Sequence, residues 1–411
     1  MFSLLNKRKF WPFFYTMGLG AFNDNLFKSA LAILIAYNYP KENADLYIQV
    51  SAGLFILPFF LFSGVSGQIC DKYEKSGLMR KIKSLEIIVM LLGFYSFYTN
   101  NINLQFISIF LMGTQSTLFG PVKYSILPLA LDKNEILPGN SLTSMGTFVF
   151  ILAGTILGGY LVSGKITQNF GLNPIAISVL FFAILGRIFS SYIPIINEKN
   201  NFKIKLNPFK VTLEAIKRIN TNKHTTLSIH GISWFWFFGF FFMASLPSFV
   251  RDVLKGDELT STLFLTLISI GMGVGSILCN YFSENKLKVG IVPFASIGLT
   301  VSALCFSMTE TTFTPTDIDG LSGIENFSLY WKHGLYVFLI GVFGGAYIVP
   351  LYTLLQLKTP KSQRSQYIAS NNIMNAIYMV SAALTSLILL SIGLEVKEIF
   401  ITVSILNILS F

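Results

Sequence analysis

The chain has 411 residues, of which 53% are hydrophobic and only 12% are charged. A soluble globular domain has about 25% charged residues, so this composition excludes a soluble fold. The net charge of +10 does not indicate nucleic-acid binding, because most Lys and Arg residues lie in short polar segments between long apolar runs. The sequence therefore predicts an all-α polytopic membrane protein.

Twelve apolar runs approach the length of about 20 residues that a helix needs to cross the hydrocarbon core. The predicted spans are residues 11–39, 47–70, 82–99, 103–130, 140–163, 173–196, 227–250, 259–282, 289–308, 333–357, 367–393 and 396 onward. Six spans precede a polar segment and six follow it. This order predicts an N-terminal six-helix bundle (1–196), a cytoplasmic linker (197–226) and a C-terminal six-helix bundle (227–411).

The two ends of the chain need separate interpretation. The first apolar run is too long for a signal peptide and no small-residue cleavage site follows it, so we expect a retained first span. The last run, Ile399–Phe411, gives only about 20 Å of helix, which is shorter than the hydrocarbon core. Either the sequence stops before its natural end or the twelfth helix is incomplete.

The distribution of basic residues predicts the orientation in the membrane. Loops on the side of the N-terminus contain 21 Lys and Arg residues, whereas loops on the opposite side contain six. Basic residues accumulate on the cytoplasmic side of membrane proteins, so the N-terminus and the central linker are expected in the cytoplasm. Within the linker, residues 208–219 are expected to form either a short amphipathic helix on the membrane surface or a simple tether.

The first span carries the polar stretch GAFNDNLFK at residues 20–28. Asp24 lies midway along the span between Asn23 and Asn25, and Lys28 follows one helical turn later. Charged side chains at membrane depth are costly and normally face a cavity or a charged partner. These four residues are candidate substrate-binding residues, with an Asp24–Lys28 ion pair of purely structural value as the alternative.

The segment GQICDKYEKSGLMRK (residues 67–81) follows the second span. It resembles the signature of the major facilitator superfamily, which has a Gly, an Asp followed by a basic residue, a second Gly and a basic pair. Gly67 would allow close helix packing, and Asp71 would form a gating latch with basic partners such as Lys72 or Arg80. An ordinary polar turn is the alternative.

The fourth span contains FGPVKYSIL at residues 119–127. Pro121 interrupts the helical hydrogen bonds one turn from Lys123, and the backbone groups it releases need a polar or water-filled surrounding. We therefore place Gln115, Lys123 and Tyr124 among the substrate-binding residues. A lysine that snorkels to the nearby cytoplasmic surface is the alternative for Lys123.

Arg187 is a third basic residue within a span, for which snorkelling and substrate binding are both open. If most of these charges share one cavity, Asp24 is the only acid among two or three bases. A surplus of positive charge favours an anionic ligand group, and phosphate suits Lys and Arg well.

The two halves of the chain show a weak internal repeat. Residues 113–127 can be aligned with residues 341–355, which places Tyr124 on Tyr352. The following span begins with Asn140 in the first half and with Asn371 and Asn372 in the second, and we add these three to the substrate-binding candidates. Two parallel six-helix repeats are the plan of the major facilitator fold, whose substrate site lies near the midplane of the bilayer.

Four stretches also resemble one branch of that superfamily, the bacterial lysophospholipid transporters. They are AFNDNLFK (21–28), FGPVKYSIL (119–127), GNSL (139–142) and GTILGGYL (154–161). The resemblance implies inward movement of lysophospholipid across the bacterial inner membrane for re-acylation. It further implies that Asp24, Asn25, Lys123 and Tyr124 lie on the headgroup path, and that an acyltransferase, fused or separate, is a partner.

Two other functions remain open at this point. One is a major facilitator exporter of drugs or small organic anions, driven by protons through Asp24. The other is a membrane module that anchors or feeds a fused acyltransferase without transporting anything. The sequence contains no acyltransferase His-x4-Asp motif and no metal-ligand spacing, so we expect no enzymatic activity, cofactor or metal site.

Overall fold

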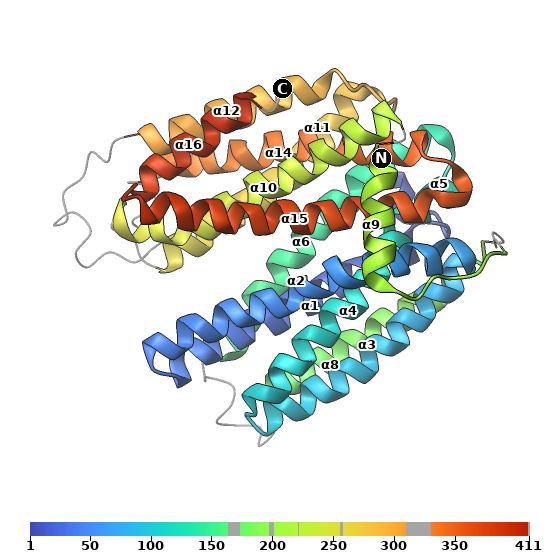
Figure 1. Cartoon of the computed structure of the whole chain (residues 1–411), viewed down its shortest axis with the longest axis horizontal. Helices are drawn as coiled ribbons and strands as arrows, with labels where there is room; N and C mark the ends of the chain where they lie inside the picture. The colour runs from blue at the N-terminus through green and yellow to red at the C-terminus, as the bar shows by residue number, and fades with distance from the viewer. Residues whose placement is uncertain (163–172, 197–200, 221, 255–257, 310–329, 410–411) are drawn as a thin grey trace. The chain divides into compact units, whose positions relative to one another are not determined.

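The computed structural model describes residues 1–162, 173–196, 201–220, 222–254, 258–309 and 330–409. Within them, twelve α-helices are at least 14 residues long (Figure 1). They are α1 (Trp11–Asn38), α2 (Lys41–Lys72), α3 (Lys75–Tyr98), α4 (Ile102–Ser125), α6 (Ile136–Val162), α8 (Pro174–Ser191), α10 (Lys223–Asp252), α11 (Glu258–Ser283), α12 (Ile291–Met308), α14 (Trp331–Lys358), α15 (Arg364–Ser391) and α16 (Val396–Leu409). The predicted all-α polytopic fold is confirmed, and each predicted span corresponds to one of these helices.

The largest difference from prediction is the start of α3, which begins at Lys75 rather than at residue 82. The side chain of Glu74 caps this helix by accepting hydrogen bonds from the backbone N–H groups of Ser76 (2.8 Å) and Gly77 (2.6 Å). Such a cap satisfies amides that have no partner within the helix. Lys83 therefore lies more than two turns inside α3 and not in the preceding loop.

Shorter helices connect the long ones. The fourth span continues after Ser125 as α5 (Leu127–Ala130), and short 3-10 helices occupy Phe2–Asn6, Lys133–Glu135 and Lys361–Gln363. The linker contains α9 (Pro208–Ile219), so of the two alternatives for this segment the helix is the one observed. The Asn207 side chain caps α9 by accepting a hydrogen bond from the Lys210 amide at 3.1 Å, and Pro208 occupies a first-turn position that suits proline.

The chain forms two compact units that largely follow its two halves. The first unit comprises Met1–Gly139, Val149–Thr226 and Leu355–Ile373, and the second comprises Asn140–Phe148, Leu227–Leu354 and Met374–Phe411. Each unit thus includes a short segment from the other half of the sequence. The division into bundles at residues 197–226 stays a prediction.

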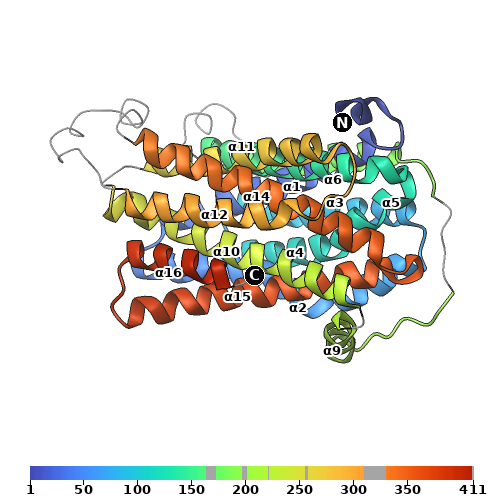
Figure 2. The same cartoon turned by 90° about the horizontal axis from the view of Figure 1, so that it is seen from above.

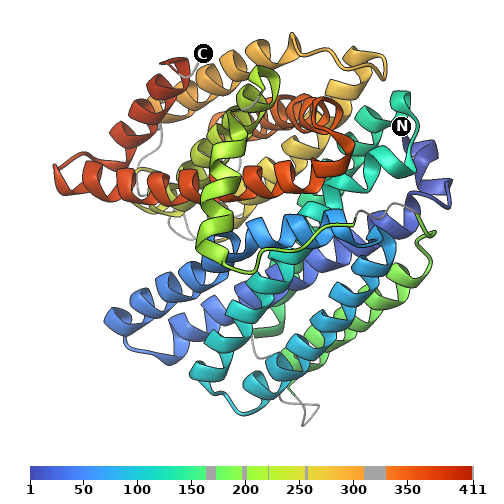
Figure 3. The ribbon, with the colours of Figure 1, turned by 45° about the vertical axis from the view of Figure 1, so that its right-hand side comes forward.

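In the first unit, α2 packs against α4, and α3 lies between α4 and α8 (Figures 1 and 3). Glycine permits the closest approaches. A Cβ atom at Gly113 of α4 would lie 2.4 Å from the carbonyl oxygen of Phe55 on α2, and one at Gly154 of α6 would lie 2.2 Å from that of Phe22 on α1. At these positions any larger residue would force the helices apart.

The second unit uses the same device between α11 and α14. A Cβ atom at Gly341 of α14 would lie 2.3 Å from the carbonyl oxygen of Ile268 on α11. Helices α11 and α14 are the second and fourth long helices of the C-terminal half. They therefore pack as closely as α2 and α4, the second and fourth helices of the N-terminal half, do at Gly113. Gly113 and Gly341 are aligned in the internal repeat. Around this contact the core of the unit is aromatic, with Phe242 and Phe249 packed on Phe306.

Eight helices of the described residues are long and apolar enough to cross a membrane by composition alone. Helices α1, α3 and α4 are not among the eight, although each has at least 24 residues. All three carry charged or amide side chains in their middle turns. These are the helices that form the candidate site.

Candidate functional site

Six side chains from α1, α3 and α4 form a polar cluster inside the first unit. They are Asn23, Asp24, Lys83, Glu86, Gln115 and Ser116, and we refer to them as the polar cluster. Asn23, Lys83, Glu86 and Gln115 are buried, and Asp24 and Ser116 are partly buried. Buried polar groups are costly unless they are hydrogen-bonded or paired, so the contacts among these residues decide whether the three helices pack together.

An ion pair between Lys83 and Glu86 is the centre of the polar cluster. Lys83 Nζ donates to Glu86 Oε2 at 2.6 Å, and both side chains are only 1% exposed. Gln115 of α4 donates to the same carboxylate oxygen at 3.1 Å, and Asn23 of α1 donates to Glu86 Oε1 at 3.5 Å. One carboxylate thus connects all three helices.

A glycine makes room for the lysine. A Cβ atom at Gly20 on α1 would lie 2.6 Å from Lys83 Nζ, so only glycine fits there without displacing the ammonium group. The ammonium also lies 5.3 Å from the centre of the Phe119 ring on α4, where a cation–π interaction supplements its ion pair.

Asp24 and Lys28 have different partners. Asp24 Oδ2 accepts a hydrogen bond from the Ser116 hydroxyl at 2.6 Å, and Ser116 also lies 3.3 Å from Gln115 Oε1. Lys28 Nζ lies 4.4 Å from the centre of the Phe55 ring on α2. Among the described residues these two side chains do not form the ion pair that their spacing allowed.

The expectation that Asp24 is the only acid at membrane depth is wrong, because Glu86 is buried in α3. Glu86 lies inside the predicted span 82–99, but only Asp24, Lys28, Lys123 and Arg187 were counted as charges within spans. The spacing of Lys83 and Glu86 in KIKSLEIIVM (residues 81–90) was the available signal, since charges three residues apart share a helix face. Two acids, Asp24 and Glu86, therefore lie in the same three helices as Lys28, Lys83 and Lys123, and α3 carries Lys75, Arg80 and Lys81 in its first two turns as well.

Lys123 and Tyr124 lie further along α4. Lys123 is one turn beyond Phe119, and its Nζ atom lies 5.1 Å from the centre of the Tyr124 ring. The helix continues through Pro121 to Ser125. The carbonyl oxygen of Tyr124 accepts a hydrogen bond from Gln356 at 3.0 Å.

Arg187 on α8 lies outside the polar cluster. Its Nε atom donates to the Ser84 hydroxyl at 2.9 Å, and its Nη1 atom donates to Ser191 at 2.5 Å. Ser84 is adjacent to Lys83 in sequence but lies on another face of α3. Lys83 is buried, whereas Ser84 is only partly buried. The structure therefore separates Arg187 from the residues with which it was grouped.

The four remaining asparagines occupy different surroundings. Asn25 donates to the Ala21 carbonyl of its own helix at 2.7 Å. Asn140 belongs to the second unit, where it donates to the Thr353 hydroxyl at 2.9 Å. Asn371 in the first unit is fully buried, and neither atom of its amide has a hydrogen-bond partner. Asn372 lies beside Gly120 of α4, where a Cβ atom would come within 2.7 Å of its Nδ2 atom.

The predicted gating residues Gly67 and Asp71 lie where α2 meets the start of α15, within the first unit. A Cβ atom at Gly67 would lie 2.7 Å from the Cβ atom of Ala369, so glycine is required for this contact. Asp71 is 1% exposed and accepts hydrogen bonds from the backbone N–H groups of Ser365 (3.0 Å) and Gln366 (3.2 Å). A carboxylate at a helix N-terminus is stabilised by the helix dipole.

The expected partners of Asp71 are different from those observed. Arg80 donates to the Ile193 carbonyl oxygen at 3.2 Å and lies 3.9 Å from Glu74, while Lys72 Nζ lies 5.8 Å from the centre of the Tyr73 ring. Asp71 therefore accepts hydrogen bonds from the amides of α15 and from the side chain of Gln366, which donates to it at 3.1 Å. A helix terminus replaces the basic side chains because it offers several aligned donors.

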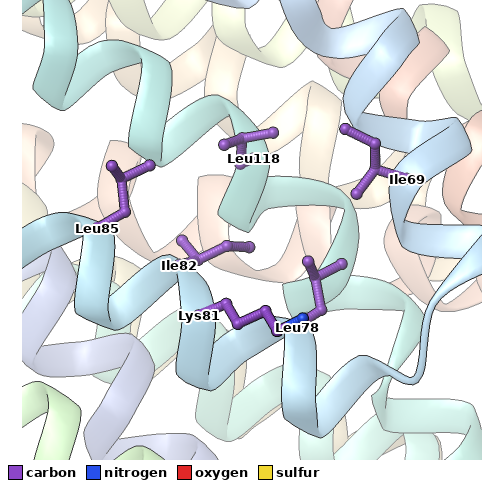
Figure 4. A pocket seen from close by; sticks show the side chains of 6 residues that line it. All are labelled: Ile69, Leu78, Lys81, Ile82, Leu85 and Leu118. Carbon is purple, nitrogen blue, oxygen red and sulfur yellow. The ribbon is translucent and has the colours of Figure 1, made fainter.

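A small cavity lies between α2, α3 and α4 (Figure 4). Its volume is about 170 Å³, and its lining is apolar except for one lysine. The lining residues are Ile69, Leu78, Lys81, Ile82, Leu85 and Leu118. Ligand pockets usually enclose about 300–1,000 Å³, so this cavity is too small for a lipid. It does not include any residue of the polar cluster.

The fold and the buried charges define a polytopic membrane transporter, and sequence comparison gives the same class. Residues 13–383 match the family described as Major Facilitator Superfamily. Because this match covers most of the chain, the protein belongs to that superfamily.

Within the superfamily, similar relatives are bacterial proteins named Lysophospholipid transporter LplT. The protein from Escherichia coli K12 is 26% identical over 394 residues, which cover 95% of this chain and 88% of the relative. The protein from Photorhabdus laumondii is 25% identical and covers 82% of this chain and 77% of the relative. These matches confirm the resemblance inferred from the first, fourth and fifth spans.

Solved structures of transporters share the fold. The human organic anion transporter MFSD10 superimposes with a TM-score of 0.74 at 12% identity and covers 98% of both chains. The Escherichia coli fucose:proton symporter FucP gives a TM-score of 0.71 at 9% identity and covers 97% of this chain and 96% of its own. At these identities the similarity establishes the fold alone.

Proposed function

We propose that the protein transports lysophospholipids and that the charges of α1 and α4 recognise the headgroup. The observation that carries this proposal is that Asp24, Lys28 and Lys123 lie within two helices of one unit of a chain whose relatives are named lysophospholipid transporters. A zwitterionic headgroup, with a phosphate and an amine, needs both signs of charge. A site for a simple anion has no need of Asp24.

Each charged residue has a proposed role. Lys123 attracts the phosphate, with Lys28 as a second basic group, and Asp24 meets the amine of an ethanolamine headgroup. Asp24 contacts Ser116, and Ser116 is seven residues before Lys123 on α4, which is about 10.5 Å along the helix axis. Lys83 and Glu86 neutralise each other, so we assign them to positioning α1 and α4. Asn23, Asn25, Gln115 and Tyr124 line the headgroup path, with Asn371 and Asn372 as further neutral contacts, and Asn140 stays a separate candidate in the second unit.

The transport cycle follows the plan of the superfamily. We propose alternating access in the bacterial inner membrane, with a cytoplasmic N-terminus and inward movement of the substrate. The contact of Asp71 with the α15 amides would break and re-form in each cycle. An acyltransferase that consumes the imported lysophospholipid is the proposed partner, and no chemical step is assigned to the transporter itself.

The test is uptake of labelled lysophosphatidylethanolamine by proteoliposomes containing the purified protein. Wild-type protein is expected to transport, and Lys123→Ala and Asp24→Ala are each expected to reduce the initial rate at least about tenfold, as for the loss of a buried charged contact. Thr266→Ala, at a partly exposed position of α11 in the second unit, is the control and should keep the wild-type rate. If both charge variants transport at the wild-type rate, the assignment of the site is wrong.

A second candidate is export of small organic anions, which the excess of lysine over acid within α1, α3 and α4 favours. An exporter of this kind would accept anions without an acyl chain. Competition by such anions against labelled lysophospholipid, with and without a protonophore, separates the two functions. Transport of lysophospholipid that no small anion inhibits would eliminate the exporter, whereas a broad substrate range that collapses with the proton gradient would favour it.

A further inference from the structure

Helix α9 presents three faces, of which only one is explained by packing inside the protein. Val211, Thr212, Ala215 and Ile219 are buried. This face lies on α2, where a Cβ atom at Gly64 would come within 2.8 Å of the Val211 side chain, and the Thr212 hydroxyl donates to the Phe60 carbonyl oxygen at 3.3 Å. The buried face fixes the position of α9 on α2.

The second face is apolar and exposed. Leu206 is 78% exposed, Phe209 is 66% exposed and Leu213 is 60% exposed. Phe209 and Leu213 are four residues apart and form one stripe beside the buried face of α9, and Leu206 lies just before the helix begins. In a protein surrounded by water such a stripe would be unfavourable, so it indicates contact with an apolar phase.

The third face is basic and polar. Lys210, Glu214, Lys217 and Arg218 follow one another at helical spacing on the remaining surface of α9. A helix with one apolar stripe and a lysine-rich opposite face is typical of helices that lie in the plane of a membrane interface.

The position of α9 on α2 matches this interpretation. In Figure 1 α9 runs across the direction of α2, and in Figure 2 α9 is seen nearly end-on while α2 runs lengthwise. Its contacts are with Phe60 and Gly64, which lie within the last four turns of α2, and Gln68 in the same turns accepts a hydrogen bond from the Lys205 amide just before α9. Because α2 crosses the bilayer, a helix that lies crosswise on its flank near one end must be at the depth of the membrane interface.

A cavity of about 420 Å³ lies beside α9 in the first unit. Three bases, Lys203, Lys205 and Arg218, line it together with a single acid, Glu214. Lys205 pairs with Glu214 at 2.8 Å, and the Arg218 guanidinium lies 6.0 Å from the centre of the Tyr367 ring. The cavity therefore retains positive charge, and it also contains amide groups such as that of Gln366.

We propose that α9 and this cavity form a binding site for a phospholipid with a net negative headgroup. Phe209 and Leu213 enter the apolar part of the leaflet, and Lys203 and Arg218 bind the phosphate of the lipid. Gln366, which lines the cavity, also holds Asp71, so a bound headgroup stabilises the contact between α2 and α15. The lipid is a regulatory ligand distinct from any transported substrate, and the proposal does not depend on which substrate is moved.

The depth of α9 is tested with the full chain in lipid bilayers. Phe209→Trp adds a fluorophore on the exposed apolar stripe, and Lys217→Trp adds one on the polar face as the matched control. The emission added at residue 209 is expected to be quenched by phospholipids brominated on the acyl chains, and that at residue 217 to be quenched by aqueous iodide. Equal quenching of both positions by iodide would overturn the insertion of α9 into the leaflet.

Selectivity is tested by comparing brominated phosphatidylglycerol with brominated phosphatidylethanolamine, each as a minor component of the bilayer. The Phe209→Trp protein is expected to be quenched more by phosphatidylglycerol. Adding Lys203→Gln should weaken this preference about fivefold, the effect of one lysine at a membrane surface. Lys133→Gln, an exposed lysine remote in sequence, should leave it unchanged. Equal quenching of the Phe209→Trp protein by the two lipids would overturn the proposal. So would a site that inorganic phosphate occupies in competition with both lipids alike, because the site would then bind phosphate without preferring either lipid.

Discussion

The interiors of the two compact units contain different kinds of buried polar groups. In the first unit, Lys83 and Glu86 form a buried ion pair to which α1 and α4 contribute amides. In the second unit, the described helices carry Asp, Glu, Lys or Arg only near their ends. There the Asn407 amide of α16 accepts a hydrogen bond from Trp234 at 2.6 Å and donates to Thr300 at 2.8 Å.

This difference teaches how a repeated fold divides its tasks. Both units need internal hydrogen bonds, because polar groups that face lipid or an apolar core are costly. A neutral network meets that need at lower desolvation cost than charges do. The buried charges of the first unit therefore require another explanation, and we propose that Asp24, Lys28 and Lys123 are kept there to recognise a charged substrate group.

The largest loss of stability is expected from breaking the Lys83–Glu86 ion pair of the first unit. Glu86→Leu leaves Lys83 buried without its partner and should destabilise the protein by about 3–5 kcal/mol. Asn23 and Gln115 lose an acceptor at the same time. Thermal unfolding of the purified protein in detergent, monitored by circular dichroism, measures the loss.

The double variant Lys83→Met and Glu86→Leu sharpens this prediction. Because no unpaired charge remains, its stability should return to near that of the wild type. If the double variant is as unstable as Glu86→Leu alone, the penalty does not arise from an uncompensated charge. If the pair only positions α1 and α4, as proposed, this variant should also recover part of the transport rate.

A smaller loss of stability is expected from a substitution in the second unit. Asn407→Leu removes the acceptor of the Trp234 indole N–H, and an unsatisfied buried donor costs about 1–3 kcal/mol. Stability should fall, whereas the preference among headgroups should not change because this unit does not carry the charges. A changed headgroup preference, measured by competition between lysophospholipids, would contradict the division of tasks.

Asp71→Asn should have a still smaller effect on stability. The amide keeps one acceptor for the α15 amides but removes the charge that the helix dipole stabilises, which is worth about 0.3–2 kcal/mol. Transport should slow more than stability falls, because this contact is the proposed latch. Thermal unfolding and lysophospholipid uptake are both measured on the same preparation, and the loss of stability is compared with the loss of transport rate. The isosteric substitution Gln68→Glu provides a comparison at a nearby buried position.

The smallest expected effect concerns pH and lies outside the membrane spans. Burial tends to raise the pKa of Glu74, but hydrogen bonds from Ser76, Gly77 and Ile196 outweigh it and hold the pKa below its ordinary value of 4.5. The resulting stabilisation is complete above pH 4.5 and is lost as pH falls toward the lower folded-state pKa. Glu74→Gln should flatten the acid limb of a plot of melting temperature against pH. An unchanged acid limb would show that this cap does not titrate in that range.

The sequence predicted the helices well because hydrophobic length is a local property. Each span is recorded in about 20 consecutive residues, and the bounds of α9 match those of the amphipathic helix that was one of two alternatives for the linker. The start of α3 was missed because its cap, Glu74, lies in a segment rich in charge that resembles a loop.

The site was predicted less completely because its contacts join residues far apart in the chain. Asn23 and Gln115 were singled out from their own segments, but the carboxylate of Glu86, which lies 63 residues from Asn23 and 29 from Gln115, connects them only in the fold. Likewise, the partners of Asp71 lie 294 and 295 residues away at the start of α15. The sequence around Asp71 offered Lys72 and Arg80 as nearby basic partners. It contains no signal that points to the N-terminus of a helix so far along the chain.

The central claim is that the charges of the first unit recognise a zwitterionic headgroup. It is tested most directly by the rate of lysophosphatidylethanolamine transport relative to that of lysophosphatidic acid, which lacks the amine, in wild-type and Asp24→Asn proteoliposomes. We predict that Asp24→Asn lowers this ratio, because only the first substrate has an amine for the carboxylate to bind. A ratio that stays the same in the variant would contradict the account.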